Sequence, residues 1–215
     1  MKTFKKLSLV ALVCTSISAY GTAQVNDEEK ESKVRFGIKA GMNFSNVYDS
    51  EGEEFRADGK LGLAGGFFVS IPIGEMLGFQ PEILLSQRGF KATGSILTMP
   101  YELKRTSTYL DIPLLFSFRP APFISIVAGP QYSYLLNQKD DFESSLFSFN
   151  VENEFDNDNI RKNTLGFVGG VDVNIGHFVV GTRVGCDLIN NRGDGTSSTP
   201  RYKNVYGQLT AGFRF

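Results

Sequence analysis

Residues 204–215 read NVYGQLTAGFRF, and apolar and polar side chains alternate along them. In an extended chain, the apolar set then lies on one face and the polar set on the other. The apolar face reaches Phe213 and Phe215; a sheet in water would leave these two rings uncovered, whereas lipid covers them in a membrane barrel. We therefore expect this stretch to be the closing strand of a transmembrane β-barrel, with Phe213 and Phe215 as its C-terminal barrel-assembly signal.

The same alternation recurs in other stretches of the chain. They cover about residues 35–44, 60–71, 77–90, 108–118, 123–136, 161–175 and 178–189. Long polar segments, among them residues 91–100 and 137–159, separate these stretches in alternation with short turns, and we interpret them as loops. An even strand count with this asymmetry is typical of outer-membrane barrels. The sequence thus predicts an all-β fold over residues 35–215: an eight-stranded antiparallel transmembrane β-barrel with short periplasmic turns and longer external loops.

The first 23 residues have the pattern of a signal peptide. Lysines at positions 2, 5 and 6 precede an apolar run over residues 7–19, and residues 21–23 supply the small side chains of a cleavage site. We expect cleavage between Ala23 and Gln24, followed by a polar, acidic periplasmic lead over residues 24–34. The chain is therefore expected to be exported to the outer membrane.

Composition limits the function classes. A length of 215 residues argues for one domain, and a formal net charge of −1 gives no electrostatic footprint for nucleic acid. Cys14 raises a lipoprotein leader as an alternative, but Val13 before it is too large for the usual lipobox. Cleavage leaves Cys186 as a lone thiol, which excludes an intramolecular disulfide. The alternation points Cys186 toward lipid, where it would be inert.

The face opposite the apolar stripes carries charges of both signs. These are Lys39, Arg88, Arg183 and Arg214 against Glu82, Asp111, Asp172 and Asp187. An eight-stranded barrel is only wide enough for side chains to fill, and buried charges must pair. We therefore expect a lumen charge network that plugs the barrel and leaves no wide channel. A soluble lipocalin-like barrel is the alternative fold, with its apolar residues around a ligand cavity and its charges in water.

Four stretches carry a resemblance to a known family. They are GIKAGMNFS at residues 37–45, PEILLSQRG at 81–89, YLDIPLL at 109–115 and GPQYSYL at 129–135. The chain resembles the PorT-family outer-membrane β-barrel domain, a family of small barrels with OmpA-like architecture, over nearly all of its mature length. The resemblance implies the fold and the location, and it carries no catalytic motif. The family's namesake is associated with secretion of proteins across the outer membrane.

Few residues of the sequence are candidates for catalysis or metal binding. Outer-membrane enzymes that modify lipid A use a serine with a histidine at the outer leaflet, but His177 lies in a short turn on the periplasmic side. The segment Asp156-Asn-Asp-Asn159 offers oxygen atoms to calcium but lacks the spacing and the glycine of an EF-hand loop, so we interpret it as a solvated acidic loop. We expect no catalytic residue, no metal site and no cofactor. The tyrosines expected at the interfacial aromatic belts are Tyr109, Tyr132, Tyr134 and Tyr206.

The first functional hypothesis is an integral outer-membrane barrel of structural or interaction type, associated with the envelope or with protein secretion. Its expected partners are the lipid of the outer membrane, the barrel assembly machinery acting on the C-terminal strand, and an envelope or secretion-system protein. The second hypothesis is a small pore for ions or small solutes. The third is an outer-membrane lipid-modifying enzyme that depends on His177.

Overall fold

The computed structural model describes residues 33–48, 57–96, 99–144, 148–153, 161–190 and 202–215. Its strands are β1 (Arg35–Tyr48), β2 (Ala57–Pro72), β3 (Leu77–Ile96), β4 (Met99–Ala121), β5 (Ile124–Ser144), β6 (Ser148–Asn153), β7 (Asn163–Ile175), β8 (Phe178–Asp187) and β9 (Lys203–Arg214). Within these ranges, no helix has the length and hydropathy needed to cross a membrane. The expected signal peptide, its cleavage point between Ala23 and Gln24, and residues 24–32 lie outside the described residues.

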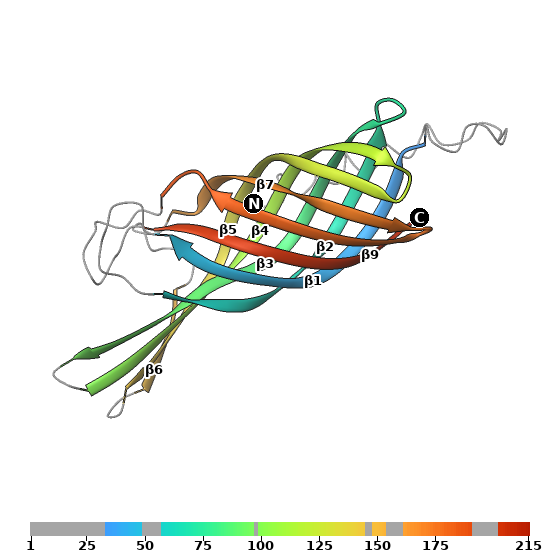
Figure 1. The fold of residues 1–215 in the computed structure, drawn as a ribbon. Helices are drawn as coiled ribbons and strands as arrows, with labels where there is room; N and C mark the ends of the chain where they lie inside the picture. Colours follow the sequence, from blue (N-terminus) through green and yellow to red (C-terminus); the bar gives the residue numbers. More distant parts are fainter. Residues whose placement is uncertain (1–32, 49–56, 97–98, 145–147, 154–160, 191–201) are drawn as a thin grey trace, which may run out of the picture. The chain divides into compact units, whose positions relative to one another are not determined.

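All the strands except β6 close into a barrel. Around it the order is β1-β2-β3-β4-β5-β7-β8-β9 with every neighbour antiparallel, and β9 pairs back onto β1 from Gly37↔Arg214 to Tyr48↔Lys203. Closure leaves no barrel strand with an unpaired edge, which a sheet in lipid requires because hydrocarbon offers no partner to peptide groups. The predicted eight-stranded antiparallel barrel, closed by its last strand, is confirmed (Figure 1).

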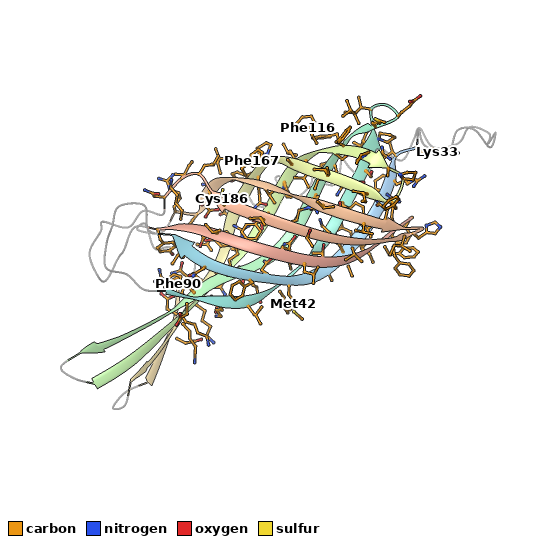
Figure 2. The ribbon with its side chains drawn as sticks, viewed as in Figure 1. Lys33, Met42, Phe90, Phe116, Phe167 and Cys186 are labelled. Atoms are coloured by element: carbon orange, nitrogen blue, oxygen red, sulfur yellow. The ribbon has the colours of Figure 1, made fainter. Side chains whose placement is uncertain are left out.

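Side chains alternate between the outside and the lumen along the barrel strands. Along β8 this alternation between exposed and buried positions is unbroken. Large apolar side chains such as Met42, Phe116 and Phe167 stand on the outer face (Figure 2), and Phe116 is 63% exposed although it lies in the middle of a long strand. Soluble monomers rarely expose apolar surface on this scale, so lipid is its natural cover. The arrangement is the reverse of the lipocalin-like alternative, whose outer face would be polar.

Three strands run well past the length that a bilayer needs. β3, β4 and β5 have 20, 23 and 21 residues, whereas a tilted strand crosses a bilayer with roughly 9–11 residues. The pairing of β3 with β4 continues to Ile96↔Met99, and β6 pairs with the far end of β5. Residues 90–96, 99–106, 137–144 and 148–153 thus contribute a sheet of four strands, here called the extension sheet, which leaves the barrel at the end opposite the short turns (Figure 1).

The interpretation of residues 91–100 and 137–159 as loops is therefore wrong for all of their described parts. Residues 91–96, 99–100, 137–144 and 148–153 are in strands. A sheet that stands in water has no hydrocarbon to meet, so its strands need not carry the outward apolar stripe of a membrane strand. Backbone pairing continues beyond that point, since each hairpin partner is already aligned by the barrel below it.

Candidate functional site

The first group of lumen charges is the Glu82 cluster, which contains Lys39 of β1, Glu82 of β3, Asp172 of β7 and Arg183 of β8. Glu82 forms an ion pair with Lys39, and its Oε1 lies 3.7 Å from Arg183 Nη2. Arg183 binds Asp172 through two contacts, Nη1 to Oδ1 at 2.7 Å and Nη2 to Oδ2 at 2.8 Å. None of the four residues is more than 8% exposed. Two cations and two anions make the cluster neutral, as burial away from water requires.

The second group is the Arg88 cluster. Nη2 of Arg88, on β3, forms an ion pair with Asp111 of β4, and Nη1 lies 3.6 Å from Asp187 Oδ1 of β8. The guanidinium carbon also lies 5.0 Å from the ring centre of Tyr109 and 4.2 Å from that of Tyr206. Aromatic faces stabilise a cation that has lost its water, and the flat guanidinium suits them better than an ammonium group does. The cluster therefore combines ion pairs with two cation–π contacts around one buried arginine.

Both clusters join opposite walls of the barrel. In the ring of strands, β3 and β8 are four positions apart, so they face each other across the lumen. Glu82 of β3 reaches Arg183 of β8 at 3.7 Å. Further along the same two strands, Arg88 reaches Asp187 at 3.6 Å. A straight path along the lumen is interrupted at both levels.

Hydrogen-bonded amides and hydroxyls fill the space around the charges. Gln208 Nε2 donates to Asn43 Oδ1 at 2.9 Å, and Asn43 Nδ2 donates to the Ser86 hydroxyl at 2.8 Å. The Tyr206 hydroxyl donates to Gln131 Oε1 at 2.7 Å. An apolar group on the wall formed by β4, β5 and β7 consists of Leu115, Val127 and Val168. The described lumen is a packed interior in which these polar side chains bind one another, while the buried Nε atoms of Arg88 and Arg183 and Oδ1 of Asp111 have no hydrogen-bond partner.

Glycines on the lumen wall make room for these side chains. A Cβ at Gly181 would lie 2.5 Å from Asp172 Oδ1, and a Cβ at Gly185 would lie 2.4 Å from Cζ of Tyr206. Either contact would force a cluster member to move. Part of the high glycine content, 23 of 215 residues, is thus a requirement of the filled lumen.

A third group, the mouth cluster, closes the barrel where the extension sheet begins. Arg105 of β4 donates to both oxygens of Asp140 on β5, from Nε at 2.8 Å and from Nη2 at 2.7 Å, and Nη1 donates to the Tyr202 hydroxyl at 3.2 Å. Phe90 meets Tyr202 edge-on with ring centres 5.4 Å apart. Burial acts to lower the pKa of Arg105, but the hydrogen bonds from Arg105 to Asp140 and the Asp140 charge outweigh it and raise that pKa, so the guanidinium stays charged. β4 and the start of β9 lie on opposite walls, so the contact with Tyr202 is a third bridge across the lumen.

Sequence reasoning missed the mouth cluster because Arg105 and Asp140 fell outside the expected strands. The sequence does contain a signal for Arg105. Every second residue counted back from Asp111 lies on the same inward face, and this series passes through Tyr109 and reaches Arg105. The same parity explains a second correction. Tyr109 and Tyr206 line the lumen against Arg88 and are not at the aromatic belts.

Arg214 is also placed differently from the prediction. The other seven charges predicted for the lumen network lie in the two clusters, but Arg214 lies at the short-turn end. Its Nη1 is 3.2 Å from Asn174 Oδ1, and its Nη2 is 3.4 Å from the Gly176 carbonyl oxygen. Among the described residues no carboxylate forms an ion pair with it. Position 214 belongs to the alternate set of β9 residues that faces the lumen. Along the barrel axis, however, it lies closer to the short turns than any carboxylate of the lumen clusters does.

His177 is exposed in the turn between β7 and β8. Its Nδ1 lies 2.8 Å from the Arg214 carbonyl oxygen, and its ring stacks on Phe213 with ring centres 5.6 Å apart. Neither of these partners is a nucleophile. Phe213 also meets Phe178 and Phe215 edge-on, at 5.4 and 5.3 Å between ring centres. The terminal aromatic residues thus belong to a rim of rings at the short-turn end, and their role in barrel assembly stays a prediction.

Other candidate ligands are placed as follows. Across the described ranges, no three histidine, cysteine, aspartate or glutamate side chains gather in a way that could hold a metal ion. The acidic segment Asp156-Asn-Asp-Asn159 lies outside the described residues. Cys186 is an exposed free thiol on the outer face of β8.

Comparison with known proteins supports the architecture. The sequence model of a family described as outer membrane protein beta-barrel domain matches residues 22–191. No curated protein matches the chain. The fold is similar to that of Ail, the attachment invasion locus protein of Yersinia pestis, with a TM-score of 0.50 and 15% identity over 85% of this chain and 99% of that chain. A major outer membrane protein from Thermus thermophilus gives a TM-score of 0.46 and 13% identity over 85% and 100% of the two chains. OprG from Pseudomonas aeruginosa gives a TM-score of 0.44 and 12% identity over 86% of this chain and 97% of that chain.

Proposed function

Because the chain belongs to the family of outer membrane protein β-barrel domains and resides in the outer membrane, we propose that it is a closed barrel of structural or interaction type. The observation that carries this proposal is the bridging of the lumen at three levels, by Glu82 with Arg183, by Arg88 with Asp187, and by Arg105 with Tyr202. A barrel filled in this way offers no wide path to solutes. Its activity then lies on its surface.

The surface that we propose for this activity is the extension sheet. Strands about twice as long as a bilayer needs serve no purpose in crossing it, so their outer halves act beyond the membrane. Asp140 and Arg105 tie β5 to β4 at the base of the sheet and hold it in a defined direction. The resemblance to the PorT family favours a protein of the envelope or of protein secretion as the partner. The proposal includes removal of residues 1–23 on export, a periplasmic lead over residues 24–34, and insertion by the barrel assembly machinery.

Conductance in planar bilayers tests the closed lumen. We expect purified wild-type protein to give no reproducible conductance. A variant with Arg88→Ala, Arg105→Ala and Arg183→Ala removes one side chain from each bridge and should conduct, provided that its gel migration still shifts on heating. Lys139→Ala removes an exposed cation outside the lumen and is the matched control. Conductance by the wild type would overturn the proposal and favour a pore.

Shortening the extension sheet tests its role. Replacing residues 93–102 by Asn-Gly joins Ala92 to Leu103, which already pair, and replacing 142–149 in the same way joins Asp141 to Asn150. We expect the shortened protein to stay in the outer membrane and to shift on heating, because the barrel strands are intact. A photo-crosslinking residue within 93–96 should capture a protein in cells, whereas the same probe at Glu75 in a short turn should not. Equal capture from both ends would contradict the assignment of the partner to the extension sheet.

A further inference from the structure

The extension sheet has an open edge, unlike the barrel from which it rises. In the order of the strands, β6 comes last, and it pairs with β5 on one side (Figure 1). All six residues of β6 take part in this pairing, which runs from Glu143↔Ser148 to Gln138↔Asn153. None of the other strands that the structure describes pairs with the second side of β6. The described sheet therefore ends on a regular strand whose outer backbone groups have no strand partner.

The sequence of β6 does not protect this edge. Proteins usually protect an open edge with a lysine or a proline in the edge strand, with a bulge, or by keeping the strand very short. β6 reads SFNVEN, which contains no lysine and no proline, and its register with β5 has no bulge. Its one charged residue is Glu152, and six residues are an ordinary length for a strand. β6 thus has the properties of an edge that accepts another strand.

The other edge of the extension sheet is shorter. It belongs to β3, and β2 covers β3 as far as the pair Ala57↔Ala92, so that residues 93–96 remain beyond β2. Successive residues of a strand direct their N–H and C=O groups to opposite sides, so every second residue of an edge strand is available to a partner. β6 therefore offers the longer backbone template of the two edges.

Acidic residues dominate one face of the sheet beside the open edge, the face opposite to the mouth cluster. Lys139 and Asp141 of β5 lie on that face, with 3.8 Å between Nζ and Oδ1. The alternation of the strand places Glu143 on the same face, and the register sets Glu152 of β6 directly opposite Lys139. In the two strands nearest the edge, one lysine thus stands against three acids. Since opposite charges on neighbouring strands attract, a strand with lysine or arginine at alternate positions fits this edge best.

We propose that the open edge of β6 binds an extended basic segment of a partner protein, which joins the extension sheet as a further strand. The inference rests on the proposed function, because it states how the extension sheet holds its partner. In strand addition, backbone hydrogen bonds supply the affinity and alternate side chains supply the selectivity. The pair of Arg105 with Asp140 fixes the base of the sheet on the barrel, so the edge is presented in a defined direction.

A synthetic peptide tests the edge directly. The probe is a labelled peptide with blocked ends and the sequence Lys-Thr-Lys-Val-Lys-Thr-Lys-Val, and fluorescence anisotropy measures its binding to the full protein in micelles of an uncharged detergent. We expect this peptide to bind, and the same peptide with glutamate in place of lysine to bind about tenfold more weakly. Methylation of the two central amides removes one donor from each edge of the peptide and should also weaken binding about tenfold.

Proline substitutions in β6 provide the matched variants of the protein. Asn150→Pro and Val151→Pro each remove one backbone N–H, and these two N–H groups point to opposite sides of the strand. The loss on the outer side removes a donor to the peptide, and the loss on the inner side loosens β6 from β5. We therefore expect both variants to bind the peptide about tenfold more weakly or worse. Asn150→Ala and Val151→Ala keep the N–H groups and should bind like the wild type, and every variant must still shift on heating.

Three results would overturn the proposal. The first is a lysine peptide that does not bind, or that binds both proline variants as tightly as the wild type. The second is equal binding of the lysine and glutamate peptides, which would remove the preference for a basic segment. The third is a protein that is dimeric in detergent and becomes monomeric in Val151→Pro, because a second copy would then occupy the edge. A partner in cells that is still captured from residues 93–96 in the proline variants would contradict the edge alone, whereas the absence of any capture from the extension sheet would contradict the proposed function.

Discussion

Glu82→Gln tests whether charge pairing inside the lumen stabilises the barrel. Glu82 is 2% exposed and pairs with both Lys39 and Arg183. In the variant Arg183 keeps its two contacts with Asp172, but Lys39 loses the carboxylate with which it pairs. Breaking a buried pair by removing one partner costs about 3–5 kcal/mol. We expect the lower end, about 3 kcal/mol or on the order of 100-fold in the ratio of folded to unfolded protein, because the glutamine oxygen still accepts a hydrogen bond from Lys39.

Urea unfolding in lipid vesicles, read from the gel migration of unboiled samples, measures this free energy. Adding Lys39→Met to Glu82→Gln removes the unpaired charge, so we expect most of the lost stability to return. Asp141→Asn is the matched control, since its 3.8 Å pair with Lys139 is partly exposed and should be worth less than about 1 kcal/mol. A loss below about 1 kcal/mol in Glu82→Gln would refute the reasoning, because it would mean that water reaches the cluster. A double variant no more stable than the single one would show that the lysine charge is not the cause.

Arg105→Lys keeps the charge, but a lysine cannot donate to both oxygens of Asp140 in the same geometry. We therefore expect limited proteolysis to cut the extension sheet faster, while the gel migration of the barrel still shifts on heating. An unchanged rate of proteolysis would contradict the role of this pair. Gly170→Ala puts a Cβ 1.9 Å from a backbone oxygen of β8 and should lower the urea midpoint strongly, whereas Gly207→Ala, whose Cβ meets nothing within 4 Å, should leave it near the wild-type value. Equal urea midpoints in the two variants would mean that the backbone of the lumen wall can shift to accommodate the added Cβ. Cys186 should react with a charged maleimide in detergent but slowly in vesicles, where lipid covers it, and fast labelling in vesicles would place it above the membrane.

The period of two in the sequence was enough to predict the barrel and the faces of its strands. A residue in a membrane strand points either to hydrocarbon or to the lumen, so composition must alternate along every strand. Arg183 and Asp187 stand on the lumen side of β8 and Val184 stands on the lipid side for this reason. The pattern failed in the strands of the extension sheet, which continue the backbone pairing of the barrel beyond the length that a bilayer needs.

The pairing of the lumen charges was decided by the tertiary structure. Sliding a strand by two residues leaves every side chain on the same face but changes its height and its neighbours. Arg214 and Arg105 share the parity of the lumen charges, yet one lies at the short-turn end and the other at the mouth. The contact between Arg88 and Asp187 exists because closure of β9 on β1 sets β3 opposite β8. That closure depends on the hydrogen-bond register all around the barrel, which no local stretch of sequence contains.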